Sequence, residues 1–176
     1  MRIPYLGLLC VSCAGAAAKP AAPPPAQACA SPEHRQLDFW IGDWDVTIKT
    51  QGQEARGRQH VEAILAGCAI SESFSAEGPQ QPWAGRSYSS WQPALGKWRQ
   101  TWVDDSGGYL AFTGGVEQGT MTLYGEPRTG KDGKAFQMRM VFLDVTPAAL
   151  RWEWQRSYDD WKTHMVMMTI DYQRRR

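Results

Sequence analysis

From about residue 43 to the C-terminus, apolar and polar residues alternate in short segments separated by glycine, proline and aspartate. An alternation with a period of two predicts β-strands that bury one face and expose the other. The residues between the segments favour tight turns. The pattern predicts about ten strands, near residues 43–50, 56–66, 68–76, 84–92, 97–104, 109–117, 120–126, 135–145, 149–157 and 164–174.

Short connections make successive strands antiparallel neighbours. About ten strands paired in chain order close most simply into an all-β, up-and-down barrel, because closure leaves no exposed sheet edge. A two-sheet sandwich is the alternative, and it requires long crossing connections that the spacing of the turns does not provide. A barrel of this strand number is wider than its side chains alone can fill, so we expect an internal cavity.

One helical signal precedes the strands. Ser31 suits the capping position of a helix, Pro32 suits its first position, and Glu33 suits its first turn, where the helix dipole favours negative charge. The sequence therefore predicts a short helix that ends near Trp40. We assign residues 31–176 to the barrel domain.

The first thirty residues are typical of a targeting signal followed by a linker. Arg2 precedes an apolar stretch that ends in small residues, so residues 1–18 are predicted to be a signal peptide. Cleavage as late as Ala28 also fits, and residues 19–30 read as a linker rich in proline and alanine. The apolar stretch is shorter than the roughly 20 residues of a membrane span. We expect a periplasmic or secreted protein, with a lipid anchor at Cys13 as an alternative.

The net charge and the aromatic content of the chain indicate which kinds of partner to expect. The 176 residues suffice for one domain, and 19 Lys and Arg against 18 Asp and Glu give a formal net charge of +1. This balance gives no electrostatic reason to expect a nucleic-acid partner. The nine Trp and six Tyr favour half-buried β-surfaces and binding cavities.

Cys29 and Cys68 are the two cysteines beyond the predicted signal peptide. An exported chain reaches an oxidising compartment, so a Cys29–Cys68 disulfide is predicted, with two unpaired thiols in a cytosolic protein as the alternative. The cysteines and histidines lack the spacing of a zinc site, and we predict no metal site.

Five segments of the chain share their order with a known family. They are HRQLDFWIGDWDV (34–46), GCAISE (67–72), GRSYSSW (85–91), KWRQTWVDDSGG (97–108) and SYDDWKT (157–163). These segments resemble a bacterial exported family of unknown function whose domain is a lipocalin-like (calycin) β-barrel. The resemblance covers nearly everything after residue 30 and implies the fold, but no activity. Similarity to lipocalins and to nitrobindin is more distant.

The chain departs from that family at the last turn. Asp160 and Trp161 stand where the family tends to have a pair of glycines, and His164 stands where it tends to have tryptophan. The turn is therefore expected to differ in shape.

Gly42 and Trp44 form a Gly-x-Trp sequence similar to that of lipocalins, in which the tryptophan closes one end of the barrel beneath a basic residue of the last strand. The resemblance implies that Trp40 and Trp44 form the barrel floor and that Arg174 lies across it. Gly42 would let the chain pack closely, and the indoles would bury large apolar surfaces. We expect structural roles for this group.

Candidate binding residues are polar side chains that share a strand face with tryptophans. Gln100 and Trp102 alternate in one strand, so they lie on the same face. A polar group on such a face is costly to bury without a partner, and this indicates a pocket wall. Alternation alone leaves open which face is inner. The wall could be completed by Glu72, which could pair with Arg139, and by Ser89, Arg139 and Trp154.

These residues favour a noncatalytic carrier or sensor of a small apolar or amphipathic molecule. An isomerase or hydrolase that uses the same polar residues is the first alternative, although no catalytic constellation is recognised. A haem-binding barrel, as in nitrobindin, is the second, with His164 or His60 as the axial ligand. A fully packed barrel that acts as an interaction or envelope protein is the third. No cofactor is otherwise predicted.

Overall fold

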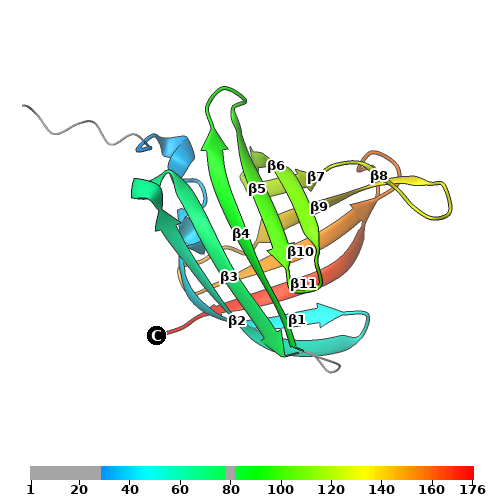
Figure 1. Ribbon diagram of the computed structural model, residues 1–176, viewed down its shortest axis with the longest axis horizontal. Coiled ribbons are helices and arrows are strands. Elements are labelled where there is room, and N and C mark those ends of the chain that lie inside the picture. Colours follow the sequence, from blue (N-terminus) through cyan, green and yellow to red (C-terminus); the bar gives the residue numbers. More distant parts are fainter. Residues whose placement is uncertain (1–28, 78–81) are drawn as a thin grey trace, which may run out of the picture.

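The computed structural model describes residues 29–77 and 82–176. Two short 3-10 segments, η1 (Pro32–Arg35) and η2 (Asp38–Trp40), precede the strands, and a third, η3 (Leu65–Gly67), lies between two of them (Figure 1). The strands are β1 (Gly42–Thr50), β2 (Gln53–Ile64), β3 (Ala69–Glu77), β4 (Pro82–Gln92), β5 (Lys97–Asp104), β6 (Tyr109–Glu117), β7 (Thr120–Gly125), β8 (Arg128–Thr129), β9 (Ala135–Leu143), β10 (Ala149–Ser157) and β11 (Met165–Arg174).

The strands form a closed antiparallel barrel. Neighbouring strands pair in the order β10-β11-β1-β2-β3-β4-β5-β6-β7-β9, and the pairing of β10 with β9 closes the ring. The remaining strand, β8, has two residues and pairs only with the start of β9. The predicted up-and-down barrel of ten strands is therefore confirmed, and β8 is an addition within the loop that precedes β9.

The predicted N-terminal helix is two 3-10 turns rather than one continuous helix. Ser31 makes no capping bond to the backbone of η1. Its hydroxyl instead donates to a carboxylate oxygen of Glu33 at 2.6 Å and lies 2.9 Å from Nδ1 of His34. The chain then turns again through η2, which buries Trp40.

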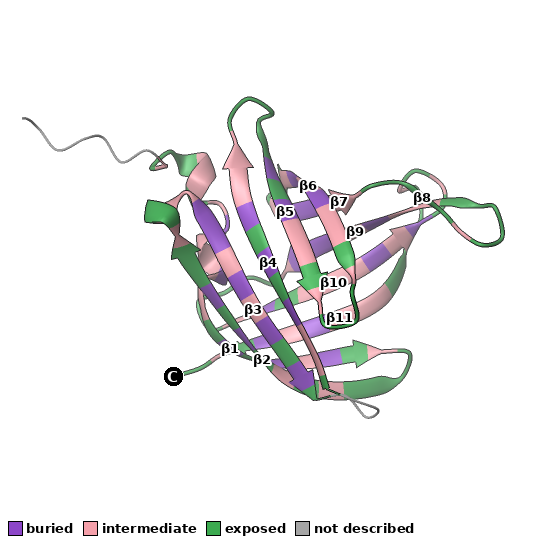
Figure 2. Ribbon diagram, in the orientation of Figure 1, coloured by how far each residue is buried: buried purple, intermediate pink, exposed green. Residues whose placement is uncertain are grey.

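Side chains alternate between the barrel interior and solvent. Figure 2 shows buried residues alternating with more exposed ones along β2, β3 and β4. Because inward residues from the ten strands of the barrel meet, the apolar positions form one core. The largest side chains that are nearly inaccessible to solvent are Trp44, Trp98, Leu37 and Leu123.

Trp44 and Arg174 close one end of the barrel. Trp44 is fully buried, and its Nε1 donates to the carbonyl of Trp40 at 2.8 Å. The guanidinium of Arg174 lies 4.0 Å from the centre of a Trp44 ring and donates to the carbonyls of Ile41, Phe39 and Pro147. A cation over an indole face and charge-assisted hydrogen bonds both stabilise this closure.

Gly42 is required by the same closure. Its φ is +139°, and a Cβ at this position would lie 2.1 Å from Nη1 of Arg174. Any side chain here would strain the backbone and displace the guanidinium. Glycine therefore lets the start of β1 pass directly beneath Arg174.

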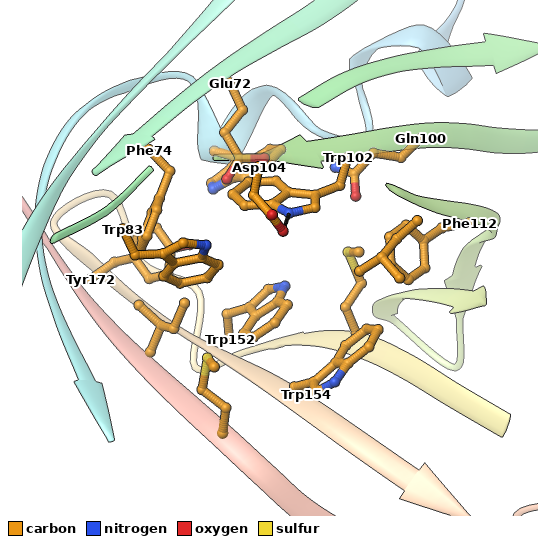
Figure 3. A pocket seen from close by; sticks show the side chains of 15 residues that line it. Glu72, Phe74, Trp83, Gln100, Trp102, Asp104, Phe112, Trp152, Trp154 and Tyr172 are labelled. Atoms are coloured by element: carbon orange, nitrogen blue, oxygen red, sulfur yellow. Dashed lines mark hydrogen bonds between the residues drawn. The ribbon is translucent and has the colours of Figure 1, made fainter. Parts of the chain in front are cut away.

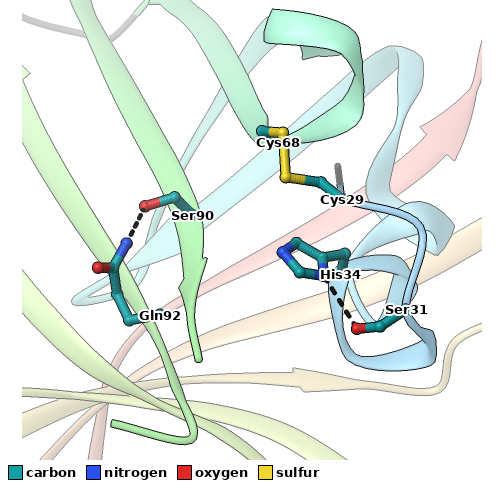
Figure 4. Close-up of a disulfide and its surroundings, with 6 residues drawn as sticks. All are labelled: Cys29, Ser31, His34, Cys68, Ser90 and Gln92. Carbon is teal, nitrogen blue, oxygen red and sulfur yellow. Dashed lines mark hydrogen bonds between the residues drawn. A yellow bond between two sulfur atoms is a disulfide. The ribbon is translucent and has the colours of Figure 1, made fainter. Parts of the chain in front are cut away.

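The predicted Cys29–Cys68 disulfide is present (Figure 4). It joins the segment before η1 to the residue after η3, 39 positions later, at the start of β3. In the chain-entropy view, closing a loop of this length contributes roughly 4 kcal/mol. The disulfide thus holds the N-terminal turns against the closed end.

The predicted signal peptide, its cleavage sites and Cys13 fall within residues 1–28, outside the described residues. In the described part of the chain, no helix combines the length and apolar character needed to cross a membrane.

Candidate functional site

The barrel encloses a cavity of about 190 Å³ beyond its closed end. Side chains from β3, β4, β5, β6, β9, β10 and β11, together with Trp40 of η2, line it (Figure 3). The inward residues of β5 show how deep each part of the cavity lies. Trp98 donates to Gln36 in the closed end, Gln100 is buried, and Asp104 ends the strand at the opposite rim. Gln100 therefore marks the inner part of the cavity, and Asp104 marks its mouth.

Most of the cavity wall is aromatic. Phe74, Trp83 and Trp102 form one side, with ring centroids 4.9 Å apart for Phe74 and Trp83 and 5.8 Å apart for Trp83 and Trp102. On the other side, Trp152 and Trp154 stack nearly parallel at 5.9 Å. Aromatic rings offer large apolar surfaces with little loss of conformational freedom on binding. The wall thus suits a flat apolar molecule.

A glycine creates the space for one of these indoles. A Cβ on Gly85 would lie 2.0 Å from the six-membered ring of Trp102, so the indole packs directly on the backbone of β4. Register explains the contact: Trp102 pairs with Ser87 across the β4–β5 ladder, and Gly85, two residues before Ser87 on the same face of β4, pairs with Asp104. Substitution of Gly85 would push Trp102 toward the cavity.

A buried polar chain crosses β3, β4 and β5 at the inner part of the cavity. Ser87 Oγ donates to Glu72 Oε2, and Gln100 Nε2 donates to Ser87 Oγ at 3.3 Å and to Ser89 Oγ at 3.0 Å. All four residues are buried. Burial raises the pKa of Glu72 to about 7, and the hydrogen bond from Ser87 opposes this rise. The cavity therefore holds a carboxyl group that gains or loses its proton near neutral pH.

The innermost wall is formed by Trp40 and Tyr172. The hydroxyl of Tyr172 donates to Gln59 Oε1 at 2.9 Å, and burial raises the pKa of Tyr172. Among the described residues, Trp40 Nε1 and Gln59 Nε2 are buried without a hydrogen bond of ordinary geometry, although Trp40 Nε1 lies near the hydroxyl of Tyr172. Buried polar groups are nearly always paired, so these two N–H groups are exceptional.

Asp104 places a fixed negative charge at the mouth. One carboxylate oxygen accepts hydrogen bonds from the backbone and hydroxyl of Ser106 and from the backbone of Gly108, and the other accepts from Trp102 Nε1 at 3.1 Å. The hydrogen bond from the Ser106 hydroxyl, followed by those from Gly108 and Trp102, lowers the pKa of Asp104 to about 2. The carboxylate is thus ionised, and it also fixes the Trp102 indole.

The structure brings together most of the residues singled out in the sequence. Glu72, Gln100, Trp102 and Trp154 line the cavity, and Ser89 lies behind Gln100 as its hydrogen-bond partner. The face of β5 that carries Gln100 and Trp102 points inward, which alternation alone could not decide.

Arg139 does not line the cavity, and the expected Glu72–Arg139 pair does not form. Its neighbour Met140 faces inward, so Arg139 faces the outer surface of β9. There its Nε donates to Gln155 at 2.7 Å, and its guanidinium lies 4.2 Å from the centre of a Trp161 ring. The loop before β11 covers this part of the outer face with Trp161, which gives Arg139 a partner outside the barrel.

The histidines proposed as haem ligands also lie outside the cavity. His164 is exposed in the segment before β11, and His60 is exposed and pairs with Asp43 at 2.8 Å. The cavity lining contains no histidine. No group of three potential metal ligands occurs within residues 29–77 and 82–176. These residues therefore do not fit an axially ligated haem.

Several cavity residues were missed in the sequence, although alternation could have found some of them. Trp152 shares the face of Trp154, and Trp83 and Ser87 share the face of Ser89. Trp40 was assigned to the barrel floor, yet its side chain also lines the cavity. The sequence does not predict that Trp40 takes part in both the barrel floor and the cavity wall. Its contact with the cavity depends on how η2 packs when the closed end folds.

The arrangement can hold a small, mainly apolar molecule away from water, and it presents hydrogen-bonding groups at the inner end. The only charged or titratable groups on the described lining are Glu72, Asp104 and Tyr172, so the lining supplies no cation. Such a lining is suited to recognition by shape, aromatic contact and neutral hydrogen bonds.

Comparison with protein families shows that residues 30–174 match the family described as "Protein of unknown function (DUF1579)". No curated protein matches the chain. Among solved structures, a de novo designed fluorescence-activating β-barrel is similar at 12% identity, covering 79% of this chain and 96% of its own, with a TM-score of 0.45. A redesigned barrel, mFAP0, bound to DFHBI is similar at 13% identity, covering 77% of this chain and 99% of its own, with a TM-score of 0.44.

Proposed function

The chain belongs to the DUF1579 family, a family of proteins of unknown function, and we propose that it is a noncatalytic carrier or sensor of a small apolar or amphipathic ring compound. The ligand lies in the barrel cavity between the aromatic side chains of β4, β5 and β10. Gln100 and Glu72 contact its polar part.

The observation that carries this proposal is the cavity itself. Protein interiors pack densely, and voids much larger than a water molecule are few. A cavity of about 190 Å³ walled by four tryptophans of the strands is therefore a specific feature of this barrel. An engineered apolar cavity of about 150 Å³ in another protein holds benzene. The size here favours a single ring with a few substituents over a drug-sized or haem-sized molecule.

Gly85 offers a test that fills the cavity without removing any wall residue. In Gly85→Ala the new Cβ displaces the Trp102 indole toward the cavity, whereas Gly115→Ala is a matched control because a Cβ there meets nothing within 4 Å. Native mass spectrometry of each protein, recovered from its own host, would reveal a bound compound as a reproducible added mass.

We expect an adduct on the wild-type protein and on Gly115→Ala, and its loss or strong reduction in Gly85→Ala. Calorimetric titration with the identified compound should give the same order of affinities. Equal occupancy in Gly85→Ala and Gly115→Ala would contradict the placement of the ligand in this cavity. Absence of any adduct, together with no binding across a panel of single-ring compounds, would contradict the function.

Export of the protein is part of the same proposal. The N-terminal signal predicted over residues 1–18 supports it, and so does the Cys29–Cys68 disulfide, since such bonds persist mainly in oxidising compartments. Expression of the full chain in a bacterial host should yield a periplasmic or secreted form cleaved after Ala18 or Ala28. A lipid mass on Cys13 would indicate the anchored alternative, and an uncleaved cytosolic chain with free thiols would contradict export.

Glu72 favours a second candidate, an isomerase or hydrolase. A carboxyl group with a pKa of about 7 inside an apolar cavity is suited to accept and return a proton. Turnover of small cyclic ketones or esters that is lost in Glu72→Gln, while binding persists, would support an enzyme. Binding without turnover in the wild-type protein supports the carrier.

A further inference from the structure

A carboxylate at the mouth of the cavity has no cation to balance its charge. Hydrogen bonds from Ser106, Gly108 and Trp102 lower the pKa of Asp104 to about 2, so this group is ionised near neutral pH. No lysine, arginine or histidine occurs among the described lining residues, and no ion pair within residues 29–77 and 82–176 includes Asp104. The mouth therefore presents an uncompensated negative charge to a molecule that enters the cavity.

This carboxylate can also accept a further hydrogen bond. Among the described residues, Oδ1 of Asp104 accepts three hydrogen bonds from Ser106 and Gly108, whereas Oδ2 accepts one, from Trp102 Nε1. An ionised carboxylate has about two lone-pair sites on each oxygen. Figure 3 shows Asp104 directed into the space between Trp83, Trp102 and Trp152. Asp104 thus offers the cavity both a charge and an acceptor with unused capacity.

The aromatic rings around Asp104 favour a cation over an anion. Phe74, Trp83 and Trp102 lie on one side of the cavity, with ring centroids 4.9 to 6.0 Å apart, and Trp152 lies on the other. Charges attract each other more strongly where side chains exclude water, and indole rings attract cations placed over their faces. An anion here would meet Asp104 without a compensating cation.

The distance from the mouth to the buried polar chain limits the length of the molecule. Gln100 and Asp104 both line the cavity and are four residues apart in β5. A strand rises by about 3.3 Å per residue, which places their Cα atoms roughly 13 Å apart. Hydrogen bonds of about 3 Å at both ends leave roughly 7 Å between the two polar atoms of a ligand that reaches both residues. One aromatic ring with a short arm has this span.

From this charge, acceptor and spacing, and resting on the binding function proposed above, we propose that the ligand is a small arylalkylamine bound as its cation. Its ammonium group lies at the mouth and donates a hydrogen bond to Oδ2 of Asp104. Its ring lies between the tryptophans of β4, β5 and β10, and a polar substituent at the far end of the ring reaches Gln100. Asp104 thereby selects the charge of the ligand.

The test compares two probes of nearly the same shape and length. Tyramine carries an ammonium group on a two-carbon arm of a phenol ring, and tyrosol carries a hydroxyl group in its place. Calorimetric titration measures the affinity of each probe for the wild-type protein, for Asp104→Asn and for the control Asp105→Asn. The control removes the same charge from the same rim, but Asp105 is exposed, accepts a hydrogen bond from the backbone of Ala84 and does not line the cavity.

A pH of about 5.5 isolates the contribution of Asp104. Tyramine is protonated and Asp104 is ionised at this pH, whereas Glu72, with a pKa of about 7, is mostly protonated and adds little charge. We expect the wild-type protein and Asp105→Asn to bind tyramine about five-fold more tightly than tyrosol, since a partly exposed charge pair contributes about 1 kcal/mol. Asp104→Asn should bind the two probes with similar affinity.

Salt provides a second readout that does not depend on how well a variant folds. In the wild-type protein, the preference for tyramine should shrink as the salt concentration rises, because mobile ions screen a charge pair at the mouth. The affinity for tyrosol should stay nearly constant.

Each other outcome has a separate meaning. If neither probe nor any compound of the single-ring panel binds the wild-type protein, the binding function proposed above fails, and this inference fails with it. If neutral ring compounds bind but tyramine binds no more tightly than tyrosol, the binding function survives and the assignment of a cation is wrong. If the preference for tyramine persists in Asp104→Asn, is lost equally in Asp105→Asn or does not change with salt, Asp104 does not hold the cation.

Discussion

Trp40 and Trp44 are four residues apart, both are buried, and their indoles have opposite surroundings. Trp44 Nε1 donates to the carbonyl of Trp40, and the guanidinium of Arg174 covers its ring. Among the described residues, Trp40 Nε1 lies near the hydroxyl of Tyr172 without a hydrogen bond of ordinary geometry, and the Trp40 side chain borders the cavity. The closed end is thus complete within the protein, whereas the inner end of the cavity leaves hydrogen bonds unmade.

The difference separates two uses of the same side chain. A satisfied, tightly packed indole stabilises the fold, so its replacement should affect stability first. An indole at a cavity that makes no hydrogen bond of ordinary geometry contributes less to the stability of the empty protein, so its replacement should affect binding first. This contrast can be tested by substitutions in the two regions.

The largest expected effect is that of Trp44→Ala. Loss of a fully buried indole at the closed end should lower the free energy of unfolding by about 3 to 5 kcal/mol. Trp40→Phe, which keeps a ring in place, should cost much less. Urea unfolding of both variants measures the two changes. A loss in Trp40→Phe as large as that in Trp44→Ala would contradict the contrast.

Glu72 predicts a pH dependence with a defined sign. Below about pH 4.5 the carboxyl is protonated in both folded and unfolded chains, and its burial carries no ionisation penalty. As the pH rises, the unfolded chain ionises first, so Glu72 destabilises the folded state until it ionises there near pH 7. A shift from 4.5 to about 7 corresponds to roughly 3 kcal/mol at higher pH.

Glu72→Gln isolates this contribution. The difference in unfolding free energy between wild type and Glu72→Gln should change between about pH 4.5 and pH 7 and level off above pH 7. The control Glu77→Gln alters an exposed side chain at the end of β3 and should leave the profile unchanged. If the difference in unfolding free energy between wild type and Glu72→Gln did not depend on pH, burial would not raise the pKa of Glu72 in the folded protein.

Arg174 should have a smaller effect. Arg174→Met removes the cation above Trp44 and the hydrogen bonds to three backbone carbonyls, and we expect a loss of roughly 2 kcal/mol. The neighbouring Arg175 is a matched control, because its contact with Asp45 is 3.7 Å long and exposed. Arg175→Met should change stability by less than about 0.5 kcal/mol. Equal effects of the two variants, measured by urea unfolding, would contradict the role assigned to Arg174.

Much of the fold could be predicted because alternation and turn residues are local signals. The ten long strands follow from them, and β8 was missed because two residues cannot show a period. The site was less predictable. In β9, Phe136, Met138, Met140 and Phe142 alternate as a core stripe, which places Arg139 on the opposite face. The assignment of Arg139 to the pocket wall therefore overlooked a signal that the sequence contained. The partner of Arg139, Trp161, comes from a loop whose position depends on the whole barrel.

The central claim, that the cavity binds a small ring compound, can be tested on the nine tryptophan indoles in one measurement. Acetophenone is titrated into the protein, and the Nε1–H resonances are followed by two-dimensional NMR. We predict the largest shifts at Trp40, Trp83, Trp102, Trp152 and Trp154, which line the cavity. The resonances of Trp44, Trp91, Trp98 and Trp161 should move little. Shifts of equal size at all nine indoles, or no saturable shift at the five that line the cavity, would contradict the claim.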